Sequence, residues 1–100
     1  MISRHWKGIA RPGEVQNYIE HLRTDTFTKL SEINGFISAS ILKRPLAQGT
    51  EFLIITVWES IESIERFAGP RADVAVVPDV VQAMTIEYDK TVSHYEIVED

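Results

Sequence analysis

Three histidines are the side chains of this 100-residue chain whose ordinary pKa lies closest to neutral pH. His94 falls in the last apolar run, where a neutral imidazole could act as a general base. His5 and His94, with a carboxylate such as Glu96, could bind a metal, but no tight ligand spacing surrounds them. Two unrelated strand histidines, and no metal, are therefore the favoured interpretation. His21 has Asp25 four residues on, and we interpret the two as a solvated surface pair.

Trp6 and Trp58 are the only tryptophans. Either could line an apolar ligand pocket, although filling the core is the more frequent use of an aromatic ring. A pocket between helices and sheet is a normal place for a ligand. The chain contains no Gly-rich phosphate loop, no Ser-His-Asp grouping, no HExxH and no cysteine. Thiolate catalysis, disulfides and iron–sulfur ligands are therefore excluded.

The composition narrows the class of partner. The net charge is −5, the isoelectric point is near 5.1, and the closest basic cluster is Lys43-Arg44. These features argue against nucleic acid and against anionic membrane surfaces. No apolar run approaches membrane-spanning length, and residues 1–6 lack the apolar core of a signal peptide, so we expect a cytoplasmic protein. One hundred residues, 44% of them apolar, predict a single domain over residues 1–100.

The first third of the chain predicts a strand and a long helix. Ile2–Ala10 is the expected strand, in which Gly8 marks a bulge or a close backbone approach. Residues 14–33 predict a helix, because apolar side chains recur at helical spacing. The stretch 23–26 is polar and rich in threonine, which is weak helix material, so we expect a kink or irregularity there. Gly35 is the expected left-handed cap.

Two strands and a second helix follow. Phe36–Lys43 and Glu51–Trp58 predict antiparallel strands joined by a turn. Ser60 is the expected N-cap of a helix that Gly69-Pro70 ends.

The rest of the chain is less regular. Glu62 and Arg66 predict an i, i+4 ion pair on the second helix. Residues 78–84 predict one or two helical turns, residues 71–77 are ambiguous, and residues 87–98 predict the last strand.

The order βαββαβ predicts a ferredoxin-like α+β fold, with a four-stranded antiparallel sheet of order 4-1-3-2 and both helices on one face. The third strand, however, is apolar on both faces: its alternate positions carry Phe52, Ile54, Thr56 and Trp58 on one side and Leu53, Ile55 and Val57 on the other. Two helices cover only one face, and monomers avoid exposing such a surface. We therefore expect a face-to-face homodimer, unless residues 70–85 or a long loop cover the second face.

Several segments resemble the antibiotic biosynthesis monooxygenase (ABM) family. They are Asn34-Gly35-Phe36, the strand from Glu51 through Trp58-Glu59-Ser60, the helix Glu62–Gly69 and the closing Val92–Ile97. The resemblance covers essentially the whole chain. It implies a dimeric α/β barrel, which agrees with the homodimer expected from the third strand.

The resemblance implies a range of activities. Some ABM members oxygenate polycyclic phenols with no metal or flavin, and a dry pocket and a proton acceptor are what the protein supplies. Others degrade heme with an asparagine in strand one, a tryptophan after strand three and a histidine after the second helix. Here Trp58 fits the tryptophan, but Trp6 holds the strand-one position and no histidine lies between residues 59 and 93. Heme degradation is therefore less favoured.

The leading hypothesis is an ABM-like monooxygenase that acts on a small aromatic or quinone-like metabolite without a bound cofactor. Trp6 and Trp58 would wall its pocket, and His94 would be its catalytic polar group. The alternative is a non-enzymatic ligand-binding or scaffold dimer. A void between helices and sheet, with a histidine or tyrosine pointing in, would favour the enzyme, and a filled apolar core would favour the scaffold.

Overall fold

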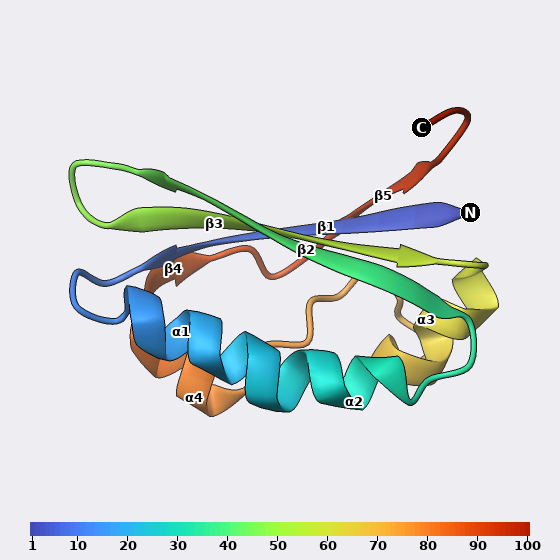
Figure 1. Ribbon diagram of the computed structural model, residues 1–100, viewed down its shortest axis with the longest axis horizontal. Helices are drawn as coiled ribbons and strands as arrows, with labels where there is room; N and C mark the ends of the chain where they lie inside the picture. The colour runs from blue at the N-terminus through green and yellow to red at the C-terminus, as the bar shows by residue number, and fades with distance from the viewer.

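The computed structural model describes residues 1–100 and contains one antiparallel sheet whose helices all lie on the same side (Figure 1). The strands are β1 (Ile2–Ala10), β2 (Phe36–Pro45), β3 (Thr50–Trp58), β4 (Thr85–Tyr88) and β5 (Ser93–Glu96). The helices are α1 (Val15–His21), the π-helix η1 (Leu22–Thr26), α2 (Phe27–Ser31), α3 (Ile61–Ala68) and α4 (Asp79–Met84). The sheet order is β2-β3-β1, with β4 and β5 on the remaining edge of β1. The ferredoxin-like fold predicted from the sequence is confirmed.

The last strand differs from the prediction because it is split in two. β4 pairs with the end of β1 and β5 pairs with its beginning. Between them the backbone bonds instead to the strap, which we define as residues 69–78 between α3 and α4. The amide of Ala75 donates to the carbonyl of Lys90 and the amide of Val92 donates to that of Asp73. A continuous strand over residues 87–98 was therefore the wrong prediction.

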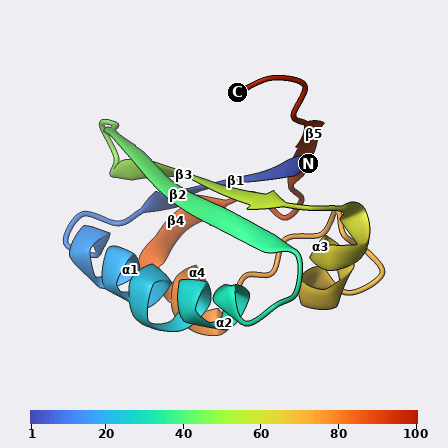
Figure 2. The same cartoon turned by 45° about the vertical axis from the view of Figure 1, so that its right-hand side comes forward.

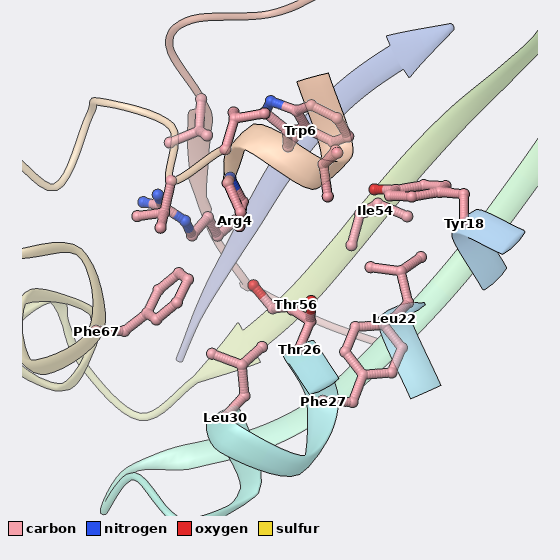
Figure 3. A pocket seen from close by; sticks show the side chains of 15 residues that line it. Arg4, Trp6, Tyr18, Leu22, Thr26, Phe27, Leu30, Ile54, Thr56 and Phe67 are labelled. Carbon is pink, nitrogen blue, oxygen red and sulfur yellow. The ribbon is translucent and has the colours of Figure 1, made fainter. Parts of the chain in front are cut away.

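The long first helix runs through α1, η1 and α2, and its irregularity falls where the threonine-rich stretch predicted it. The wide π turn covers Leu22–Thr26. Two hydroxyls compete for main-chain carbonyls beside it, since Thr24 Oγ1 donates to Glu20 O and Thr28 Oγ1 donates to Arg23 O. The π turn keeps both Leu22 and Thr26 on the side of the helix that faces the sheet (Figure 3).

The helix caps follow the sequence. Gly35 has φ +100°, as expected for a left-handed cap, and a Cβ there would lie 2.4 Å from Cβ of Ser63. Ser60 caps α3 in a reciprocal box with Ser63. The predicted pair of Glu62 and Arg66 is wrong, because Arg66 Nη1 donates to the carbonyl of Asn34 at 2.7 Å instead.

The core fills the space between the helices and one face of the sheet. One cluster includes Tyr18, Phe52 and Val81, and a second contains Leu30, Trp58 and Ile64. No helix or strap segment crosses to the other face (Figures 1 and 2). Residues 70–85 lie on the helix side, so they do not cover the second face of β3. None of the helices is both long enough and apolar enough to span a membrane.

Candidate functional site

A cavity of about 80 Å³, partly open to solvent, lies between the helices and the sheet (Figure 3). β1 and β3 form its floor, the first helix from Tyr18 to Leu30 forms one wall, and Val76–Pro78 of the strap form another. Eleven of its fifteen lining residues are hydrophobic. An apolar cavity of about 150 Å³ admits benzene, so the walls of this space would have to move apart to hold one small ring.

Tyr18 supplies an unpaired hydroxyl to this cavity. Its ring belongs to the apolar stripe of α1 and packs edge-on against Phe52, with centroids 4.8 Å apart. The residue is only 3% exposed, but its hydroxyl points into the partly open cavity and bonds to no protein group there (Figure 3). Burial raises the pKa of Tyr18, so this group is a neutral hydroxyl that can donate to a ligand.

Arg4 supplies the only charged group of the cavity wall. Its side chain is buried, with 5% of the residue exposed. Nη1 donates to the carbonyl of Ala72 and to Nε2 of His94, and Nη2 donates to the carbonyl of Val74. The guanidinium lies 5.7 Å from the ring centroid of Phe67. Burial lowers the pKa of Arg4 to about 10, against the attraction of Asp73, so the group stays cationic at neutral pH.

His94 lies behind Arg4 and is not among the lining residues. Arginine has no acceptor, so the contact of 3.1 Å between Arg4 Nη1 and His94 Nε2 requires an unprotonated Nε2. Burial lowers the pKa of His94, the charge of Arg4 lowers it further, and Asp73 acts in the opposite direction. The imidazole therefore reaches the cavity only through Arg4.

The two tryptophans have different environments. Trp6 lines the cavity and donates from Nε1 to the carbonyl of Asp89 at 2.8 Å. Its ring also covers Gly8, where a Cβ would lie 2.5 Å from the indole, so this glycine permits a close approach. Trp58 is fully buried in the second core cluster and does not line the cavity. It contacts the site indirectly, since its Nε1 donates to Oγ1 of Thr56, a lining residue.

His5 and His94 lie on opposite faces of the sheet, because the β1–β5 register pairs Arg4 with His94 and His5 with Ser93. They cannot share a metal ion. His5 contacts Oγ of Ser3 at 2.9 Å and the ring of Tyr95 at 4.9 Å on the outer face.

The interpretation of His21 and Asp25 as a solvated pair needs correction. The His21 side chain is only 14% exposed, and its Nε2 is 3.7 Å from Asp25 with no hydrogen-bond partner. Asp25 pairs more closely with Lys29, at 3.0 Å. The long first helix packs His21 against the protein rather than presenting it to solvent.

Sequence reasoning missed Arg4 and Tyr18. Arg4 alternates with Ile2 and Trp6 on the inward face of the first strand, and a charge at such a position is the signal that could have found it. Tyr18 falls within the helix predicted over residues 14–33, and the polar tip of its ring is the signal that could have found it.

Comparison with protein families gives one match: the profile of the antibiotic biosynthesis monooxygenase family matches residues 1–71. No curated protein matches by sequence.

Solved structures share the fold. A protein from Bacillus cereus, described as a candidate antibiotic biosynthesis monooxygenase, has a TM-score of 0.69 and 17% identity over 100% of this chain and 94% of that one. A point mutant of SnoaB, a cofactor-independent oxygenase from Streptomyces nogalater, has a TM-score of 0.65 and 12% identity over 99% and 94%. The heme-degrader MhuD from Mycobacterium tuberculosis, with two hemes bound in its active site, has a TM-score of 0.61 and 18% identity over 100% and 98%.

Proposed function

We propose, because the chain belongs to the antibiotic biosynthesis monooxygenase family, that it oxygenates a small aromatic or quinone-like metabolite with O2 and without a tightly bound cofactor. The observation that carries this proposal is the hydroxyl of Tyr18, which points into a mostly apolar cavity and bonds to no protein group. No protein group bonds this hydroxyl, and the cavity that it faces is partly open, so a ligand oxygen would replace water as its partner.

The reaction can be balanced without a second reductant. One O2 converts a phenol with a free ring position into a quinone and water. One oxygen atom replaces a ring hydrogen and becomes the new carbonyl, and the other leaves as water with two hydrogens taken from the substrate. The substrate supplies all four electrons. The protein would therefore need to hold the ring, keep competing water away and stabilise the ionised oxygen.

Each lining group has a role in this proposal. Trp6 and the apolar walls hold the ring, and Tyr18 donates to a substrate oxygen. Arg4 provides positive charge where the oxygen ionises. We assign His94 a positioning role, since it acts through Arg4. Trp58 orients the hydroxyl of Thr56 rather than touching the ring.

Two alternatives have less support. A scaffold without chemistry predicts a filled interior, whereas a void with an inward-pointing tyrosine favours a ligand site. Heme is a poor fit, because the cavity is about 80 Å³ and no histidine lies between residues 59 and 93. A hemin titration followed by visible absorption should show no saturable change in the Soret band.

The function is tested by O2 consumption with a panel of single-ring phenols and hydroquinones. Wild-type protein should accelerate consumption with at least one of them and release the matching quinone. Val77→Trp places a large ring in the cavity wall and should abolish that activity. Val80→Trp makes the same change at a residue 47% exposed outside the cavity, and should keep it. No acceleration by the wild type, or equal loss in both variants, would contradict the proposal.

We further propose that the protein works as a homodimer joined through the uncovered face of its sheet. Leu53, Ile55 and Val57 lie on that face and are only half-buried by their own chain. The mass of the protein in solution tests this assembly.

A further inference from the structure

We propose that the ligand of the cavity is an anion: a single-ring compound whose negatively charged oxygen group pairs with the guanidinium of Arg4. The inference rests on the proposed function in taking this cavity as the ligand site. It goes further in naming the charge of the ligand and the residue that selects it.

Arg4 is a buried cation without an anionic partner. The four ion pairs of the protein all lie elsewhere, and none includes Arg4. Its neighbours are two main-chain carbonyls, a neutral imidazole and the ring of Phe67. A charge removed from water is costly unless it is paired. Asp73 attracts Arg4 from the exposed strap without a direct ion pair, so an anion in the cavity would be the first anionic group in contact with the guanidinium.

Arg4 also has donors to spare. A guanidinium carries five N–H groups, and three of them are used for Ala72, His94 and Val74. The Nε hydrogen and one Nη2 hydrogen donate to no protein atom. The Nε–H group alone therefore leaves one edge of the guanidinium with a free donor for an oxygen anion.

The surroundings favour an anion over a neutral ligand. No aspartate or glutamate lines the cavity. The nearest acid, Asp73, is exposed on the strap and bonded to Arg71 at 3.2 Å. Apolar walls lower the local dielectric, so attraction between Arg4 and an anion is stronger here than at the surface. Tyr18 lines the same cavity, and its hydroxyl is a second donor on the side of Ile54 (Figure 3).

The space limits the rest of the ligand. A volume of about 80 Å³ is below the roughly 150 Å³ that admits benzene. One ring therefore fits only if the cavity walls move apart, and fused rings would demand a larger displacement. An aromatic carboxylate or phenolate of one ring is the chemistry that meets both the charge and the volume.

The test compares benzoate with benzamide, which has nearly the same shape and no charge. Binding to wild-type protein is measured by calorimetry and by the NMR signal of the Arg4 Nε–H. A charge-assisted hydrogen bond contributes about 1.5–3 kcal/mol, so benzoate should bind at least about tenfold more tightly. Benzoate alone should shift the Arg4 signal. Equal affinities, no binding of benzoate, or an unmoved Arg4 signal would overturn the inference, and this comparison needs no variant.

Variants then locate the selectivity. Arg4→Gln should bind benzoate and benzamide with about equal affinity, and Arg4→Lys should keep part of the preference for benzoate. Arg44→Gln removes a charge that pairs with Glu51 on the exposed end of β2, and should leave the preference intact. A preference that survives Arg4→Gln in folded protein contradicts the role of Arg4.

A coloured phenol distinguishes the phenolate from the carboxylate. If the site also takes phenolates, bound 4-nitrophenol should ionise at lower pH than the free compound, and Arg4→Gln should cancel that shift. Benzoate binding without a shift would assign the site to carboxylates. Neither probe needs to react with O2, so the two proposals can fail separately. A protein that binds benzoate selectively but oxygenates none of the phenols would contradict the proposed function and would not contradict this inference. Oxygenation without selectivity for anions would do the reverse.

Discussion

At the scale of single residues, the contact between Arg4 and His94 joins the cavity to the last strand. Arg4 can only donate, so its hydrogen bond exists while Nε2 of His94 is unprotonated. Protonation would both remove the acceptor and place a second positive charge beside a buried one. The pKa of His94 is accordingly lowered below its ordinary value of 6.5, first by burial and then by Arg4.

This coupling predicts a pH dependence of stability. With a lowered folded-state pKa, the unfolded chain binds more protons than the folded chain between that pKa and 6.5. Stability should therefore be highest above pH 6.5 and should fall as the pH drops toward the folded-state pKa. Urea unfolding on both sides of the ordinary histidine pKa measures it. His94→Gln, which cannot titrate, should show a shallower decline.

His5 should account for the pH dependence of stability that remains in His94→Gln. Its pKa is also lowered, by burial and then by the charge of Lys7, so it acts in the same direction. The stability of the double variant His5→Gln/His94→Gln should depend on pH even less. Identical pH profiles for the wild type and His94→Gln would contradict the proposed linkage.

At the scale of elements, local patterns predicted those parts of the fold that local interactions determine. β1 has the predicted bounds Ile2–Ala10, and Ser60 and Gly35 cap where their residue types indicate. The break in the last strand was missed because Ala75 and Val92 bond across to partners distant in sequence. No periodicity within residues 87–98 encodes that pairing.

The residues of the candidate site also differ in whether a local pattern or long-range packing determines their positions. Trp6 lines the cavity because alternation along β1 points it inward, and its role toward a substrate stays a prediction. Trp58 was assigned to the same wall, but its position depends on packing with Leu30 and Ile64, which are far away in the sequence. Arg4 is surrounded by the strap, His94 and Phe67, all distant in sequence, so its environment could not be inferred from its own strand.

The strap is the element whose position depends most on one side chain. Arg4 bonds to the carbonyls of Ala72 and Val74, in a segment without helix or strand structure. Arg4→Lys loses the two Nη donors that bind these carbonyls. Hydrogen exchange of the amides of Ala75 and Val92 should become faster in this variant, whereas the amides of β3 should keep their protection.

A matched substitution checks that prediction. Arg44→Lys makes the same change on the exposed end of β2 and should leave exchange in the strap unchanged. Equal protection of Ala75 in wild type and Arg4→Lys would mean that the hydrogen bonds of the strap to Lys90 and Asp73 suffice to hold it.

At the scale of the whole molecule, the sheet is covered on one side only (Figure 2). The outer positions of β3 hold Leu53, Ile55 and Val57, and the same face includes Leu42, 44% exposed, and Tyr95, 58% exposed. A face of this kind normally marks an interaction surface. A second copy presents the same apolar face, and a two-fold axis would bring the two together.

The dimer is tested by a charge at the centre of that face. Wild-type protein should sediment at twice the chain mass of 11.4 kDa. Ile55→Glu would place two carboxylates in a dry contact between the sheets, where unpaired charges are costly, and should sediment as a monomer. Val80→Glu makes a comparable change at a residue 47% exposed on the helix side, and should remain dimeric. A wild-type mass of one chain at every concentration, or equal dissociation of both variants, would contradict a contact through the sheet.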